Sequence, residues 1–128
     1  MKLLFDTHTF IWWDSEPLKL SAQVLGLCED TGNTLLVSVA SLWEMQIKLQ
    51  LGKLRLRTPL ADLVSGQQRI NRVEILDVRL EHVMALEGLP PRHRDPFDRL
   101  LVAQALVEEA VLLSRDPIFA DYPVRIEW

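Results

Sequence analysis

The run Leu3-Leu4-Phe5-Asp6-Thr7-His8-Thr9 decides the fold prediction for this chain, because a short apolar stretch ends abruptly in a carboxylate. A continuous apolar run of this kind is typical of a strand that is buried on both faces, as in a parallel sheet covered by helices. In such sheets ligands bind just beyond the carboxyl ends of the strands. Asp6 therefore stands where a functional site is expected.

The composition is that of one ordinary globular domain, residues 1–128, with 48% hydrophobic and 25% charged residues. The formal net charge of −4 argues against nucleic-acid binding through a generally basic surface. It does not exclude a nuclease whose acidic site is neutralised by metal ions. No apolar run approaches the ~20 residues that span a bilayer, so a cytoplasmic protein is expected. Cys28 is the only cysteine and is expected to be a buried structural thiol.

Strand and helix signals alternate along the rest of the chain. Further strands are expected at residues 34–39, 73–78, 111–113 and 124–126. Helices are expected to begin near Phe10, Ser21, Ser41, Thr58, Leu80 and Asp95, the last with Asp95 as its N-cap. This alternation predicts a layered α/β sandwich with a mainly parallel sheet.

Four acidic residues occupy equivalent places in that pattern. Asp6 follows the first strand, Glu44 lies in the first turn of the helix after the second strand, Asp98 lies in the first turn of the helix that begins at Asp95, and Asp116 follows the fourth strand. All four can face one edge of a parallel sheet, where crowded carboxylates repel one another unless a cation neutralises them. Oxygen ligands suit Mg²⁺ or Mn²⁺, which support phosphoryl chemistry.

Ordinary structural roles compete with this prediction. The segment Ser41-Leu42-Trp43-Glu44 matches a capping box, Asp98 could complement the helix dipole, and Asp116 could be a turn residue before Pro117. Asp6 has no such explanation, because a carboxylate straight after a buried strand does not obviously cap anything. The joint pattern favours a site over four independent structural roles.

Two other phosphoryl-transfer folds of similar layering fail on specific residues. A response-regulator receiver domain needs paired acids after its first strand and a lysine after its last, and the lysines here are Lys2, Lys19, Lys48 and Lys53. A haloacid-dehalogenase-type phosphatase needs a second aspartate two residues after the first, where this chain has His8.

Four segments carry a resemblance to a known family: Leu4-Phe5-Asp6-Thr7-His8, Ser41-Leu42-Trp43-Glu44-Met45, the run from His93 to Ala105, and Leu113-Ser114-Arg115-Asp116. In these segments, of which the third is the most specific, the chain resembles the PIN-domain toxins of bacterial toxin–antitoxin pairs, the VapC-like ribonucleases. The resemblance implies a three-layer α/β/α sandwich, a homodimer, and RNA cleavage that depends on Mg²⁺ or Mn²⁺. It also implies a cognate antitoxin that wraps the toxin and blocks the site.

Carried over position by position, the resemblance gives the catalytic set Asp6, Glu44, Asp98 and Asp116. The hypothesis that follows has Asp6, Asp98 and Asp116 holding the metal, with Glu44 completing the shell or orienting the attacking water. Hydrolysis by such a water leaves a 5′-phosphate.

The candidate RNA-binding residues are Thr7, Arg94, Arg99 and Ser114, with Arg92, His93 and Arg115 nearby in the sequence. Trp12, Trp13 and Trp43 are expected in the core or an interface rather than as platforms for bases. Two alternatives stay open: a non-catalytic module for dimerisation or partner binding, and a metal-dependent nuclease that acts on DNA.

Overall fold

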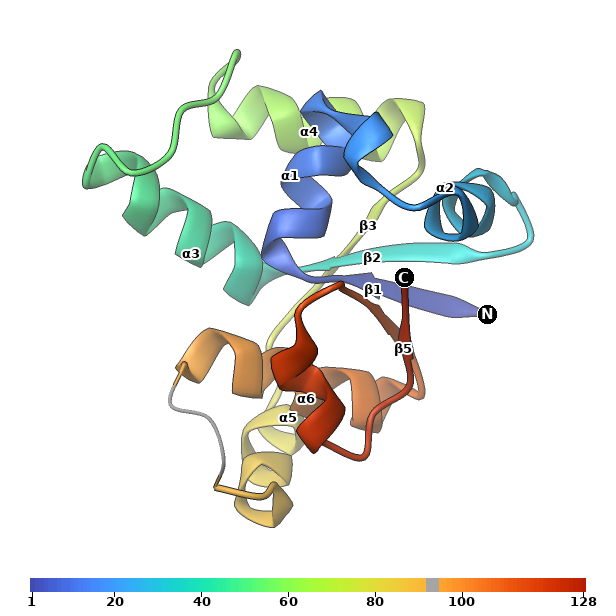
Figure 1. Cartoon of the computed structure of the whole chain (residues 1–128). Coiled ribbons are helices and arrows are strands. Elements are labelled where there is room, and N and C mark those ends of the chain that lie inside the picture. The colour runs from blue at the N-terminus through green and yellow to red at the C-terminus, as the bar shows by residue number, and fades with distance from the viewer. Residues whose placement is uncertain (92–94) are drawn as a thin grey trace.

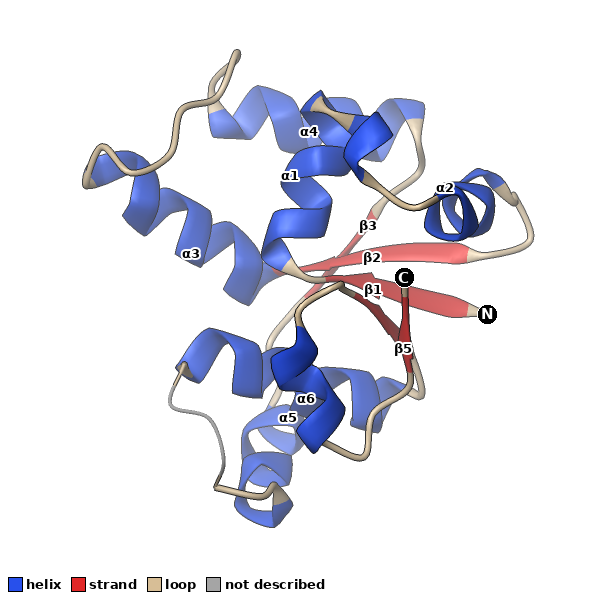
Figure 2. Ribbon diagram, in the orientation of Figure 1, coloured by secondary structure: helices blue, strands red, loops and turns tan. Residues whose placement is uncertain are grey.

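A parallel sheet forms the centre of the molecule (Figure 1; Figure 2). The computed structural model describes residues 1–91 and 95–128. Within them the strand order is β3-β2-β1-β4-β5, and every neighbouring pair is parallel. The strands are β1 (Lys2–Phe5), β2 (Thr34–Ser38), β3 (Glu74–Leu76), β4 (Val111–Leu113) and β5 (Ile126–Glu127).

Helices cover both faces of this sheet, as Figure 1 shows. One layer holds α1 (Thr7–Ser15), α2 (Ala22–Glu29), α3 (Val39–Gln50) and α4 (Leu60–Ile70), with the short 3₁₀ helix η1 (Pro17–Lys19). The other holds α5 (Leu80–Ala85) and α6 (Pro96–Glu108), with η2 (Leu86–Gly88) and η3 (Pro117–Asp121). The predicted three-layer α/β/α sandwich is therefore confirmed. Within the described ranges, no helix has both the length and the apolar character to cross a bilayer.

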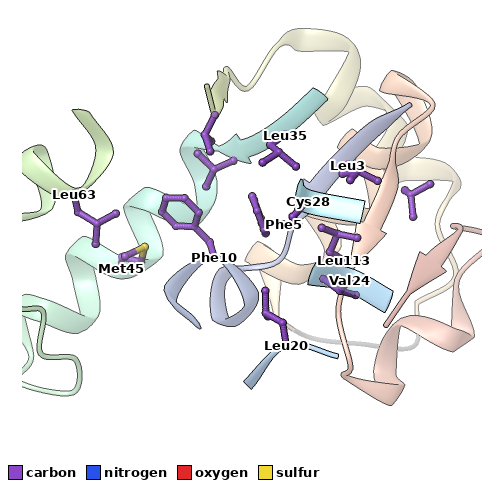
Figure 3. Close-up of a cluster of buried hydrophobic side chains, with 13 residues drawn as sticks. Leu3, Phe5, Phe10, Leu20, Val24, Cys28, Leu35, Met45, Leu63 and Leu113 are labelled. Atoms are coloured by element: carbon purple, nitrogen blue, oxygen red, sulfur yellow. The ribbon is translucent and has the colours of Figure 1, made fainter. Parts of the chain in front are cut away.

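The central strand β1 is buried on both faces, as the apolar run predicted. Leu3 and Phe5 belong to the hydrophobic core under α1–α4, which Figure 3 shows, and Leu4 belongs to the core under α5 and α6. All three side chains are completely buried. Successive strand residues point to opposite faces, so one short strand anchors both layers.

Two helices begin earlier than predicted. Helix α1 begins at Thr7, and its N-cap is Asp6, whose Oδ1 accepts the Thr9 N–H at 2.8 Å. The expectation that Asp6 caps nothing was therefore wrong. Helix α3 begins at Val39 and is capped by Ser38, whose Oγ accepts the Ala40 N–H at 3.0 Å. In both places an extended cap residue passes the chain from strand to helix without a loop.

The earlier start of α3 corrects the placement of two residues. Ser41 lies inside the helix and does not form a capping box with Glu44. Glu44 consequently lies in the second turn rather than the first. A smaller correction concerns α4, whose N-cap is Pro59 rather than Thr58, with no side-chain hydrogen bond. The predicted caps Ser21 and Asp95 are confirmed: Ser21 Oγ accepts the Val24 N–H, and Asp95 Oδ1 accepts the N–H groups of Phe97 and Asp98.

The single thiol is inert, as expected. Cys28 is buried in α2, and burial, with a smaller contribution from the charge of Glu29, raises the pKa of its thiol to about 12. Almost no thiolate is present at neutral pH, so this residue offers no nucleophile.

A buried polar network ties α5 to the end of α6. His82 is completely buried, its Nδ1 accepts the Arg79 N–H at 3.0 Å, and its Nε2 lies 2.9 Å from Glu108 Oε2. The Arg79 guanidinium and the Lys2 ammonium also bind the Glu108 carboxylate. The hydrogen bond from His82, aided by those from Lys2 and Arg79, holds the pKa of the Glu108 carboxyl below its ordinary value. The charged form of Glu108 therefore stabilises the fold.

This network predicts a pH-dependent loss of stability in Glu108→Gln. The amide keeps the shape but loses the charge, so unfolding at neutral pH should become easier by about 1 kcal/mol, the difference between charged and neutral hydrogen bonds. Because the folded pKa is lowered, the wild-type advantage is present above the ordinary value of 4.5 and is lost as the pH falls through the folded value. Urea unfolding of both proteins at neutral and acidic pH measures this, and a difference that grows on acidification would contradict it.

Candidate functional site

Two of the predicted acids share one cavity at the carboxyl edge of the sheet. Strands β1 and β4 are neighbours, and the Asp6 N–H donates to the Leu113 carbonyl at 3.1 Å, which brings the loop after β4 beside Asp6. The cavity there has a volume of about 330 Å³. Its lining residues are Asp6, His8, Thr9, Trp12, Arg115, Asp116 and Pro117. The structure thus brings together carboxylates that are 110 positions apart in the sequence numbering, Asp6 and Asp116.

Each of these carboxylates is held by one oxygen only. Asp6 Oδ1 accepts the Thr9 N–H, and Asp116 Oδ1 accepts the Ile118 N–H at 3.0 Å as the N-cap of η3. Among the described residues, neither Oδ2 takes part in a hydrogen bond or an ion pair. Asp6 is only 6% exposed, whereas Asp116 is exposed. Capping therefore fixes both side chains and leaves one oxygen of each for a ligand.

Glu44 is not one of the residues that line this cavity, and each of its oxygens has a partner within the protein. Its Oε1 accepts the Thr7 hydroxyl at 2.7 Å, and its Oε2 pairs with Lys48 Nζ at 3.0 Å. The Thr7 hydroxyl also lies 3.0 Å from Ser41 Oγ, and Thr7, Ser41 and Glu44 are all buried. Because Thr7 directly follows Asp6, this hydrogen-bonded set connects the middle of α3 to the start of α1.

Asp98 occupies the first turn of α6, as predicted, and is half-buried. The start of α6 packs against α3, because the Phe97 and Trp43 rings meet edge to face with centroids 5.3 Å apart. The neighbours of those rings in sequence are Asp98 and Glu44. The helix turns that carry these two acids therefore lie side by side at the same edge of the sheet.

These carboxylate oxygens suit a Mg²⁺ or Mn²⁺ ion that keeps part of its water shell, rather than an ion enclosed entirely by protein ligands. In the parts of the chain that the structure describes, no group of three or more His, Cys, Asp or Glu side chains is arranged to hold a metal. The cavity instead offers one oxygen each from Asp6 and Asp116. Mg²⁺ commonly binds through one or two carboxylates and completes its shell with waters and a substrate phosphate. The buried Thr9 hydroxyl at the cavity wall, which has no hydrogen-bond partner among the described residues, suits such a shell.

Three of the four candidate RNA-binding residues have contacts within the protein. Thr7 binds Glu44, and the buried Ser114 accepts the Asp116 N–H at 3.0 Å, which shapes the loop that presents Asp116. Arg99 Nη1 donates to the Pro90 carbonyl at 2.7 Å and to the Tyr122 hydroxyl at 3.2 Å. The fourth, Arg94, lies outside the described residues together with Arg92 and His93.

Sequence reasoning missed His8 and Trp12 as cavity residues. Trp12 packs partly against the core, as expected, and it also lines the cavity, with its ring 6.1 Å from that of His8. Arg115 Cζ lies 4.6 Å from the centroid of the Trp12 ring. A signal existed, because His8 and Trp12 are four residues apart and share one helix face once α1 is begun at Thr7. The predicted helix start near Phe10 left His8 outside the helix, so the shared face was not recognised.

Solved structures that share this fold include VapBC complexes, whereas no curated protein sequence matches the chain. VapBC2 of Rickettsia felis, bound to a promoter DNA fragment, has a TM-score of 0.75 at 18% identity over 99% of this chain and 98% of that one. DNA-bound VapBC of Salmonella typhimurium has a TM-score of 0.69 at 20% identity over 99% and 97%. VapBC-1 of nontypeable Haemophilus influenzae has a TM-score of 0.65 at 17% identity over 99% and 97%. At these identities the likeness establishes a shared fold.

Sequence comparison identifies the family directly. The family model of the PIN domain matches residues 3–124, which is nearly the whole chain. The match includes the segments that carry Asp6, Glu44, Asp98 and Asp116. The chain therefore belongs to the PIN domain family.

Proposed function

We propose that this protein is the toxin of a toxin–antitoxin pair and hydrolyses RNA with the help of Mg²⁺ or Mn²⁺. The observation that carries the proposal is the cavity shared by Asp6 and Asp116, in which one oxygen of each carboxylate has no protein partner among residues 1–91 and 95–128. Membership of the PIN domain family and the fold shared with VapBC complexes support it. A cognate antitoxin, a homodimer and a cytoplasmic location belong to the same proposal.

In this mechanism Asp6 and Asp116 would hold the metal, together with Asp98 from the first turn of α6. When bound, the ion lowers the pKa of a water and stabilises charge on the scissile phosphate. The protein's own contribution is rigidity, because the hydrogen bonds that the Thr9 and Ile118 N–H groups donate fix the two carboxylates before the substrate arrives. Attack by water on the phosphorus would break the P–O3′ bond, which leaves a 5′-phosphate on one product and a free 3′-hydroxyl on the other.

Glu44 acts in this proposal through Thr7. Thr7 and Lys48 each contact one oxygen of Glu44, and a carboxylate oxygen with one such contact can still accept a hydrogen bond from a water. With the contacts in place, Glu44 fixes the Thr7 hydroxyl beside Asp6.

One observation supports the alternative of a non-catalytic module, and another opposes it. Asp6, Asp95 and Asp116 all cap helices, so capping alone gives each of them a structural role. Capping does not require Asp6 and Asp116 to meet in one cavity, however, and the cavity favours catalysis. Action on DNA instead of RNA would use the same carboxylates, so the two substrates must be compared directly.

Removing the Asp98 charge should abolish cleavage. We expect Asp98→Asn to lower kcat roughly a hundredfold or more, as loss of one electrostatic stabiliser does, while the wild type cuts RNA with Mg²⁺ or Mn²⁺ and stops in EDTA. Asp62→Asn, on the exposed surface of α4, is the matched control and should retain full activity. Gel analysis of RNA and DNA substrates, with end-group analysis of the products, measures this. Undiminished cleavage in EDTA, or a 2′,3′-cyclic phosphate product, would contradict the proposal.

The Thr7 hydroxyl should matter more than its methyl group. Thr7→Val removes the donor to Glu44 Oε1 with little change of shape, which should cost about 1–3 kcal/mol of stability because that buried oxygen loses its hydrogen bond, and it should lower kcat as well. Thr7→Ser keeps the hydroxyl and should stay near wild type. Urea unfolding and cleavage rates of both variants, combined with Glu44→Gln in a double-mutant cycle, test the coupling. Equal behaviour of the valine and serine variants would show that the hydroxyl has no such role.

A further inference from the structure

We propose that the cavity beside Asp6 and Asp116 seats one nucleotide of the RNA next to the scissile phosphate, with its base stacked on the Trp12–Arg115 pair. The inference rests on the proposed function and adds a substrate subsite to it. The volume of about 330 Å³ falls at the small end of ligand pockets, as expected for a single nucleotide. The two carboxylates form one part of the wall, and the Trp12 and His8 rings form another. A base and the phosphate beside it require this combination.

Trp12 is held in place rather than free. Its ring meets that of Trp128 edge to face at 6.1 Å, and Lys19 Nζ and Arg115 Cζ lie 5.8 Å and 4.6 Å from its centroid. Single-stranded RNA is bound by stacking its bases on aromatic rings and on guanidinium planes. A ring already fixed by its neighbours loses little freedom when a base stacks there. Trp12 and Arg115 thus form a preformed platform.

The neighbouring Trp13 provides a comparison, because both its ring and its indole N–H have partners within the protein. Its ring stacks on Phe5 with centroids 6.2 Å apart, and its indole N–H donates to Gln67 Oε1 at 3.0 Å. Trp12, although it packs partly against the same core, has no hydrogen-bond partner for its indole N–H among the described residues. The fold uses both the ring and the N–H of Trp13 but leaves the N–H of Trp12 available to a base or a ribose.

Arg115 supplies positive charge where the substrate needs it. It is exposed, and within the described ranges it forms no ion pair, although Asp6 and Asp116 line the same cavity. Its guanidinium rests on Trp12 instead. In a chain of net charge −4, an unpaired guanidinium beside an acidic site offers a local contact for an RNA phosphate.

The proposal is tested by RNA binding, which does not depend on cleavage. The probes are fluorescein-labelled oligouridine, oligoadenosine and oligocytidine RNAs of about ten nucleotides. Fluorescence anisotropy measures their binding to protein that carries Asp98→Asn, alone or with one further substitution. We expect Trp12→Leu to bind about tenfold or more weakly, and Trp12→Phe, which keeps an aromatic face, to stay within about threefold. Arg115→Ala should weaken binding and reduce its salt dependence. Arg125→Ala, an exposed arginine outside the cavity, should change neither.

A scan of abasic positions through the best-bound RNA locates the base. At one position, removing the base should weaken binding to the protein that retains Trp12 as much as Trp12→Leu weakens binding of the intact RNA. The affinity for that abasic RNA should not fall further when Trp12→Leu is introduced. A scan with no position-dependent loss overturns the proposal, and this holds even if Trp12→Leu fails to fold. Unchanged RNA affinity in a folded Trp12→Leu protein also overturns it and assigns the cavity to a protein partner instead. An equal loss in Arg125→Ala overturns it in favour of diffuse charge.

The outcomes separate this inference from the proposed function. RNA binding that depends on Trp12, without cleavage by the unmodified chain in Mg²⁺ or Mn²⁺, supports the subsite and removes the nuclease. Metal-dependent cleavage with a KM that Trp12→Leu leaves unchanged retains the nuclease and overturns the subsite.

Discussion

The complete burial of three consecutive β1 residues, Leu3, Leu4 and Phe5, is the constraint on which the rest of the structure depends. Leu3 and Phe5 anchor one helical layer and Leu4 the other, so the strand cannot shift by one residue without exposing both cores. The strand then passes into α1 with Asp6 as the only intervening residue. Asp6 is therefore fixed by the core itself at the carboxyl edge of the sheet, next to the end of β4.

Capping and catalysis need not be alternatives for the acidic residues. A carboxylate that caps a helix uses one oxygen for backbone N–H groups, and this contact fixes the direction of the other. Asp6 and Asp116 both have this arrangement, and they meet in one cavity. Glu44 differs, because Thr7 and Lys48 occupy both of its oxygens. The site is thus an asymmetric one, with two available carboxylates, one engaged carboxylate and Asp98 on the adjoining helix.

Sequence patterns were sufficient for the layers, the parallel sheet and the positions of the acids after strands, because apolar runs and their spacing are local signals. They failed where one residue serves two elements: Asp6 and Ser38 continue a strand and cap a helix, so α1 and α3 were started too late. That error hid the shared helix face of His8 and Trp12 and placed Glu44 a turn too early. Arg99 binds Pro90 and Tyr122 because tertiary packing brings them together. Local sequence patterns do not contain this information.

Binding of a divalent ion by Asp6 and Asp116 in the cavity they share is what separates a nuclease site from two helix caps. Anomalous diffraction from crystals grown with Mn²⁺ can detect this binding, since the peak gives the position of the ion without any assumption about activity. We expect a peak within about 2.0–2.6 Å of a carboxylate oxygen of both Asp6 and Asp116, the range for hard cations and oxygen ligands. Asp6→Asn should remove that peak. A peak elsewhere, or a cavity that stays free of Mn²⁺ at saturating concentration, would show that these carboxylates do not bind the metal.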